Sequence, residues 1–355
     1  MNPSDNPVAN PLRPARHLAI SRAVLPLCLL GAVMPQILTQ AKAQAAPIAD
    51  ERGLSGEIQP LVGVLSSRSN LAVSSDQKRI DSLYSLSARE TRPIGGVLGK
   101  VDYTVVPKEL ALYAGTPRSA LADGELALEV GARYLVNRVG LLTAAVTPFT
   151  INDSEAWSDP FVTGTRRDAT DADRRGLRLG LAGIAGTGLS VDYRLYRRDL
   201  DDERSGQALG LSSAERRLLE REGTEHRFDL NYRVALTDNL SLTPGVQYRH
   251  LDADGAANRG WLLRPQLTAQ YDIDRWSVSM TGYYGVDRYD ARQPIYDEYR
   301  DGDEMGVAAG VRYAEPFGWS NWSVNAYGVW SERDSDIRFY DQETGLFAIG
   351  MGYRF

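Results

Sequence analysis

The chain of 355 residues contains one cysteine, three histidines and only four lysines, against 36 arginines. The single cysteine, Cys28, lies in a segment that we expect to be removed, which leaves no thiol for a disulfide, a zinc site or nucleophilic catalysis. So few histidines also limit metal and triad chemistry, and we expect no cofactor and no bound metal. Mean hydropathy is −0.33 and no stretch offers ~20 consecutive apolar residues, so a helical membrane protein is excluded.

The first 45 residues are typical of a secretory signal. Three arginines precede an apolar run over residues 23–38, and small-x-small cleavage patterns end at Ala43 and Ala45. The alternative is a basic N-terminal tail. Cleavage after Ala45 removes four basic residues and one acidic residue, so the formal net charge falls from −6 to −9. Nucleic acid is not an expected partner of such an acidic chain.

The remainder alternates between apolar and polar side chains with a period of two. In residues 275–286 one parity is apolar or small and the other is polar: Trp276, Val278, Met280, Gly282 and Tyr284 against Ser277, Ser279, Thr281 and Tyr283. Such alternation indicates a strand with one apolar and one wet face. The segments run about 10–12 residues, twice the usual length of a soluble strand. A single sheet with one greasy and one polar side closes into a barrel in lipid.

The sequence therefore predicts an all-β fold, a transmembrane antiparallel up-and-down β-barrel over residues 55–355, preceded by a short periplasmic segment at 46–54. Fourteen segments fit this pattern: 55–66, 93–105, 109–115, 123–136, 139–148, 175–186, 189–198, 224–236, 239–251, 259–271, 275–287, 302–314, 321–332 and 346–355. Twelve strands is the fallback, because residues 109–115 are short for a span. Pro244 and Pro265 fall inside predicted strands, where we expect bulges or local breaks.

Connections alternate between short and long. The short ones are 106–108, 137–138, 187–188, 237–238 and 272–274. The long ones are 67–92, 149–174, 199–223, 288–301 and 333–345, with two brief exceptions at 116–122 and 252–258. Short periplasmic turns with long outer loops are the pattern of outer-membrane barrels.

Aromatic spacing supports the same fold. Trp276 and Tyr284 lie eight residues apart on one face, as do Trp322 and Trp330. At a tilt near 40°, eight residues rise roughly 20 Å, about the distance between two aromatic girdles. The terminal Phe355, with apolar residues at alternating positions before it, resembles the signal that barrel-assembly machinery reads, and that machinery is an expected partner.

Several stretches carry a resemblance to a known family. They are Ser55-Gly56-Glu57, Trp157-Ser158-Asp159-Pro160-Phe161-Val162-Thr163-Gly164, Asp201-Asp202-Glu203-Arg204-Ser205-Gly206, Phe317-Gly318-Trp319 and Asp334-Ser335-Asp336-Ile337-Arg338-Phe339-Tyr340-Asp341. With these stretches the chain resembles proteobacterial outer-membrane β-barrel proteins catalogued as a domain of unknown function. The resemblance implies an outer-membrane location but no catalytic or binding residue.

Charged residues on the predicted inner face are the candidates for a pore lining. They are Glu125, Glu129, Arg178, Asp192, Arg194, Arg198, Arg227, Asp229, Arg233, Arg249 and Arg264. Arginines on one wall facing acids elsewhere would set a transverse field across a watery lumen, which suits small polar or anionic solutes. The main hypothesis is a passive porin-like channel for small hydrophilic solutes. The alternative is a non-conducting structural or surface-interaction barrel that its ion pairs fill.

Two further features bear on partners. A capping box at Ser212 and Glu215 predicts a short outer-loop helix, whose Arg216 and Arg217 could meet lipopolysaccharide phosphates. His226 and His250 are equidistant from residue 238 and should lie opposite each other on the lipid face of one hairpin. A lipid-facing acyl hydrolase is the remote alternative that they raise, and membrane-interface anchoring is the simpler reading.

Overall fold

The structure is a computed structural model that describes residues 48–74, 77–116, 127–150 and 154–355. The chain divides into two units, residues 1–40 and 41–355, and every described residue belongs to the second. The predicted signal segment and its cleavage site therefore lie outside the described residues. None of the helices in the described part of the chain is long and apolar enough to cross a membrane.

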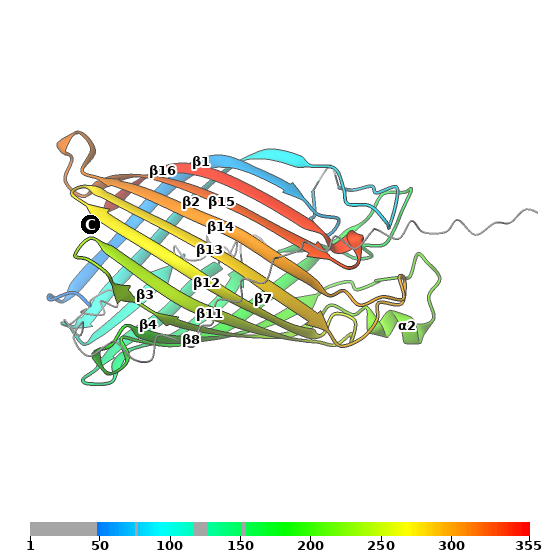
Figure 1. Cartoon of the computed structure of the whole chain (residues 1–355), viewed down its shortest axis with the longest axis horizontal. Helices are drawn as coiled ribbons and strands as arrows, with labels where there is room; N and C mark the ends of the chain where they lie inside the picture. The colour runs from blue at the N-terminus through cyan, green and yellow to red at the C-terminus, as the bar shows by residue number, and fades with distance from the viewer. Residues whose placement is uncertain (1–47, 75–76, 117–126, 151–153) are drawn as a thin grey trace, which may run out of the picture. The chain divides into compact units, whose positions relative to one another are not determined.

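The second unit is a closed antiparallel β-barrel (Figure 1). Sequence neighbours pair throughout, and β16 pairs with β1 to close the ring. Fourteen strands make up the wall, because β6 (Glu155–Trp157) pairs only with β7 and β10 (Val234–Ala235) continues β9 after a break. They are β1 (Gly53–Arg68), β2 (Glu90–Val106), β3 (Leu110–Gly115), β4 (Ala127–Val136), β5 (Gly140–Thr150), β7 (Ala169–Ala182), β8 (Leu189–Leu200), β9 (Gly223–Tyr232), β11 (Leu240–Ala253), β12 (Gly260–Ile273), β13 (Trp276–Tyr289), β14 (Gly302–Ala314), β15 (Trp322–Ser335) and β16 (Gln342–Arg354).

The prediction of fourteen strands is confirmed, and the fallback of twelve is not needed. Even the short β3 pairs on both sides, with β2 and with β4. The largest shift in a boundary is at β7, which begins at residue 169 instead of 175. Asp173 and Arg175 point outward there and form an exposed ion pair. This part of the strand extends past the apolar band, where charges on both faces hide the alternation.

Burial on the wall is the inverse of that in a soluble protein. Trp276, Met280 and Tyr284 of β13 are exposed on the outer face, whereas Ser323 and Asn325 of β15 are buried inside. An apolar outer face and a polar inner face are the arrangement of transmembrane barrels. The alternation seen in the sequence is therefore the two faces of the barrel wall.

The strand prolines interrupt ladders without shifting them. The β9–β11 ladder breaks next to Pro244 and resumes in the same register at Val234, and the β12–β13 ladder skips Arg264 and Pro265. Each proline lacks the N–H that a ladder bond requires. The expected local breaks are confirmed at both positions.

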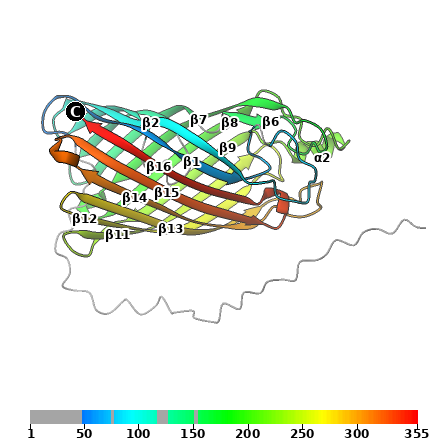
Figure 2. The ribbon, with the colours of Figure 1, turned by 90° about the horizontal axis from the view of Figure 1, so that it is seen from above.

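The two ends of the barrel differ in their connections. Lys108, Arg138 and Asp274, in three of the short turns, have positive φ values of 61°, 65° and 50°, as tight turns require. The C-terminus lies at this end, and the long connections with the helix α2 (Ser213–Leu218) gather at the other (Figures 1 and 2). The predicted capping box is present, since Ser212 accepts a hydrogen bond from the Glu215 N–H.

The chain ends are tied together at the short-turn end. The N–H of Phe355 donates to the Gly56 carbonyl at 3.0 Å, and the Gly56 N–H donates to the Phe355 carbonyl at 2.9 Å. A Cβ on Gly56 would lie 2.8 Å from the Phe355 ring, so a larger residue at this position would clash with the ring. Ile48, in the segment before β1, is buried against Ala111 and Leu141.

Candidate functional site

The inner wall is charged because strand alternation sends every second residue of β4, β7, β8 and β9 inward. Leu177, Leu179 and Val191 are exposed outside, and their neighbours Arg178 and Asp192 face the interior. Arg178 forms ion pairs with Glu129 at 3.0 Å and with Asp192 at 2.8 Å. One guanidinium therefore joins carboxylates from strands on either side of it.

The chain of ion pairs continues on the next strands. Arg194 lies 3.2 Å from Asp192 and 3.5 Å from Asp229. Asp229 also accepts from Arg227 at 3.0 Å and from the Gln247 amide at 2.8 Å. Breaking one partner of such a buried pair leaves an uncompensated charge, which costs about 3–5 kcal/mol. These residues therefore hold one another in place.

A second group of charges lies on β11, β12 and β14. Arg249 and Arg264 lie 3.9 Å and 3.5 Å from Glu304. The Arg264 guanidinium also covers the Tyr283 ring at 4.4 Å. Glu304 was not among the sequence candidates, although it shares the inward parity of β14 and could have been found by that rule.

Four more ion pairs join residues on the inner face that were not among the sequence candidates. Asp102 of β2 lies 2.6 Å from Arg133 of β4, and Asp287 of β13 pairs with Arg333 of β15. Glu57 pairs with Arg312 and Arg354 at the short-turn end. The odd or even position of each residue along its strand was sufficient to predict that it faces inward, because each lies on the polar face of its strand.

The structure differs from the expected transverse field. Arginines and acids do not occupy facing walls, because each ion pair named above joins residues at most three strands apart in the ring. Charge is therefore compensated along the wall.

The candidate residues are placed as follows. Nine of them lie on inward positions of their strands: Glu129, Arg178, Asp192, Arg194, Arg198, Arg227, Asp229, Arg249 and Arg264. Arg233 lies in the break between β9 and β10 and is exposed near the short turns. Glu125 lies outside the described residues.

Small residues also occupy inward positions, on strands that carry charges elsewhere along their length. Ala308 of β14, Ala348 of β16 and Gly96 of β2 occupy inward positions. A Cβ added to Gly96 would meet nothing within 4 Å. Ion pairs therefore occur all around the inner wall, and short side chains such as the hydrogen of Gly96 leave space between them.

The long connections form a lid with its own hydrophobic core, and four loops contribute the core's buried residues. These are Ile80 and Leu83 (loop 69–89), Phe161 (151–168), Leu219 (201–222), and Ile337, Phe339 and Tyr340 (336–341), with Tyr296 of loop 290–301 packed against them. The β1–β2 and β8–β9 loops leave the barrel on opposite sides of the strand order. Because both supply side chains to one core, the lid spans the mouth.

Buried polar groups fix the loops to one another. The Arg167 guanidinium donates to the carbonyls of Asn70 at 2.7 Å and Gln77 at 3.1 Å and stacks 4.3 Å over Trp157. Burial lowers the pKa of Arg167 to about 10, so it remains charged at neutral pH. Asp159 accepts three backbone N–H bonds, two of them from the β8–β9 loop, at Gly206 and Ala208.

The lid accounts for the loop stretches that carried the family resemblance. Trp157 and Phe161 are 1% and 3% exposed, and Phe339 is fully buried. The Asn70 amide donates to the Phe339 carbonyl at 3.1 Å and so ties the β1–β2 loop to that stretch. By contrast, Phe317 and Trp319 lie in the β14–β15 turn and are exposed.

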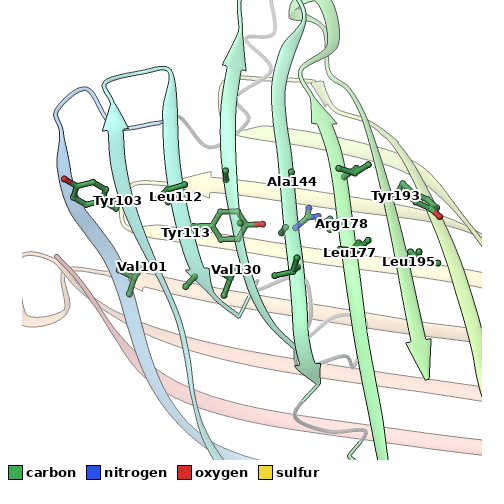
Figure 3. Close-up of a pocket in the computed structure, with 16 residues that line it drawn as sticks. Val101, Tyr103, Leu112, Tyr113, Val130, Ala144, Leu177, Arg178, Tyr193 and Leu195 are labelled. Atoms are coloured by element: carbon green, nitrogen blue, oxygen red, sulfur yellow. The ribbon is translucent and has the colours of Figure 1, made fainter. Parts of the chain in front are cut away.

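The outer face carries an apolar hollow of about 790 Å³ over β2, β3, β4, β5, β7 and β8 (Figure 3). Ala114, Ala132 and Ala144 form its floor, and Leu177 and Tyr193 stand among its walls. A second hollow of about 460 Å³ adjoins it and shares Tyr193. Most lining residues of both hollows belong to the apolar outer face, and the inward-facing Arg178 and Asp192 also border them.

The histidine pair lies on this outer face. His226 and His250 are register partners, as the sequence predicted, and their ring centres are 6.3 Å apart. The Tyr193 hydroxyl is 2.9 Å from Nδ1 of His226. In the described part of the chain no group of three or more His, Cys, Asp or Glu side chains could hold a metal ion.

Comparison with known proteins gives a family. A family model described as "Protein of unknown function (DUF2860)" matches residues 53–354. Similar solved structures include the outer membrane channel DcaP of Acinetobacter baumannii, at 11% identity and a TM-score of 0.43 over 87% of this chain and 100% of that one. OccAB1 of the same organism matches at 10% identity and a TM-score of 0.40, covering 89% and 99%. A FadL homologue of Pseudomonas aeruginosa matches at 12% identity and a TM-score of 0.39, over 85% of this chain and 90% of that one. A search among curated proteins found no match.

Proposed function

Since the chain belongs to the DUF2860 family of proteins of unknown function, we propose a function from its geometry: an outer-membrane, porin-like channel for small hydrophilic solutes. The observation that carries the proposal is the inner wall, which is lined by paired charged side chains and leaves open space at Gly96. A lumen built to be dry would not require a continuous band of ion pairs. Water and small polar solutes are the natural contents of such a space.

The expected location and partners follow from the outer face. Its exposed apolar side chains, with tryptophans such as Trp276 and Trp330, suit a bilayer. The predicted signal segment would deliver the chain to the periplasm. Phe355 and Tyr353 are exposed on the last strand, where assembly machinery could read them. Arg216 and Arg217, on the outer-loop helix, suit lipopolysaccharide phosphates.

The lid limits this channel. Because side chains from opposite sides of the ring share one core, a solute must pass between the loops or wait for them to part. We therefore expect a small conductance in the resting state, which rises when the lid is loosened.

A second candidate is a non-conducting surface barrel. The observation that favours it is the lid core itself, whose buried aromatic residues and buried Arg167 make a permanent cover conceivable. In that case the ion pairs would serve to rigidify a closed interior. The two candidates differ in one property, which is the passage of ions after the lid is disrupted.

Conductance in planar bilayers distinguishes them. The variant Arg167→Ala removes the guanidinium that joins two loops, and Arg166→Ala changes the exposed neighbour as a matched control. The channel predicts discrete openings in the unmodified protein, larger or more frequent openings in Arg167→Ala, and no change in Arg166→Ala. If neither the protein nor Arg167→Ala conducts, the non-conducting barrel replaces the channel.

A further inference from the structure

The proposed channel does not explain why two of the chain's few histidines lie opposite each other on the outer face. The chain has three histidines, and His226 and His250 are the two that lie in the barrel. They are direct register partners on β9 and β11, and both side chains are half-buried on the outer face. Two imidazoles opposite each other on adjacent strands can converge on one point in front of the sheet.

Tyr193 on the neighbouring strand β8 orients one of the rings. Its hydroxyl lies 2.9 Å from Nδ1 of His226, and its own ring packs 4.8 Å from that of Phe228. If Nδ1 carries the proton and donates to this hydroxyl, Nε2 is left with a lone pair directed away from the contact. A hydrogen bond to the distal ring nitrogen is the arrangement that metal-binding histidines usually have.

The pair lies at a level where water is within reach. The register partner of His250 on β12 is Trp261, which is exposed on the outer face near the long-loop end of its strand. Tryptophan at this position is typical of the boundary between apolar core and headgroups. Water can therefore complete a coordination shell to which the protein gives only two ligands.

We propose that His226 and His250 together bind a divalent transition-metal cation, such as Zn²⁺, Cu²⁺ or Ni²⁺, with Tyr193 as a positioning residue. Imidazole nitrogen is a preferred ligand of all three metals. With metal–nitrogen distances of 2.0–2.1 Å and tetrahedral geometry, two such rings have centres about 5 Å apart. The present separation is 6.3 Å, so small side-chain rotations bring both rings onto one metal.

The site would join β9 and β11 within the continuous part of their ladder, which runs from Gly245 and Asn231 to Ala253 and Gly223. Pairing between β9 and β11 is interrupted next to Pro244 and Arg233. A metal held by one histidine from each strand would cross-link the two strands on the outer face. The proposal does not depend on conductance, because the pair faces away from the lumen.

The test is metal titration of the folded barrel in detergent micelles, with protein made without a histidine tag. Calorimetry with ZnCl₂ should give one site per chain, and both His226→Ala and His250→Ala should abolish it. Tyr193→Phe should keep the stoichiometry and weaken the affinity about 10–100-fold. Tyr248→Phe, on the same face of β11, is the matched control and should bind as the unmodified protein does.

A spectroscopic measurement separates ligation from adventitious binding. Cu²⁺ bound to the unmodified protein should show electron paramagnetic resonance couplings from two imidazole nitrogens, reduced to one in either single variant. His226→Gln replaces His226→Ala if the latter fails to fold, as judged by heat-modifiable gel migration. Absence of zinc binding, or binding that persists at full strength in both histidine variants, overturns the proposal.

Discussion

The barrel wall and the lid bury opposite kinds of residues. In the wall, arginines and carboxylates point inward and leucines face out, whereas in the lid Phe161 and Phe339 are buried. The reason is the solvent outside each region: lipid surrounds the wall and water surrounds the lid. The wall therefore places its polar residues inside and the lid places its apolar residues inside. Each region should respond to a different class of substitution.

The largest expected effect is on the lid. Phe339→Ala removes a fully buried ring from a core that four loops share, and such truncations cost about 3–5 kcal/mol. Hydrogen exchange followed by mass spectrometry should show faster exchange in all of these loops and unchanged exchange in the strands. Equal deprotection of the strands would mean that lid and wall are one cooperative unit.

The next effect is on the wall. Arg178→Ala leaves Glu129 and Asp192 without a shared partner, which we expect to cost about 3 kcal/mol in urea unfolding of the micellar barrel. The control Arg175→Ala lies on the same strand, with an exposed outward side chain, and should cost less than about 1 kcal/mol. Equal losses in the two variants would contradict an inward ion-pair band.

A smaller effect is expected at α2. Ser212→Ala removes the cap of this six-residue helix and should cost about 1 kcal/mol locally. Exchange should accelerate in residues 213–218 and nowhere in the hydrophobic core of the lid. Spread of the effect to Phe339 would show that the helix, although exposed, supports that core.

The smallest effect concerns pH. Burial, with Asp301 nearby, raises the pKa of Asp336 in the lid. A raised carboxyl pKa in the folded state means that ionisation opposes folding, so its cost is present at neutral pH and disappears as pH falls through the folded pKa. Asp336→Asn should therefore slow exchange in the lid slightly at pH 7, and the difference should vanish near pH 3. Faster hydrogen exchange in the lid of Asp336→Asn at pH 7 would mean that the ionised carboxylate stabilises the lid, and would contradict this prediction.

The strands of the wall were predictable from the sequence because the patterns that mark them involve only residues close together in the chain. Alternation, the turn positions and the terminal Phe355 each depend on neighbours in sequence, so the fourteen strands were placed to within a few residues. The inward candidates were predicted by the same parity. Glu304, the partner of Arg249 and Arg264, was not predicted because parity assigns a residue to the inner face without saying which strand will supply its partner.

The lid was not predictable in the same way. Phe161 and Phe339 lie in charged loops with no periodicity, and their contact depends on how the ring brings distant loops together. Aromatic residues in long polar loops were the available signal, since a solvated loop has little reason to carry them. The lateral pairing of charges also depends on strand order around the ring.

Accessibility of single cysteines is the most direct test of a wet interior within an apolar exterior. Cys28 is the only cysteine in the sequence, so in a chain expressed from residue 46 onward Gly96→Cys and Val97→Cys each introduce the single thiol, on adjacent residues of β2. Gly96 faces open space inside and Val97 is 63% exposed on the outer face. In lipid vesicles a charged, water-soluble maleimide should modify Gly96→Cys and leave Val97→Cys unreacted. Reaction at position 97 with protection at 96 would contradict the account.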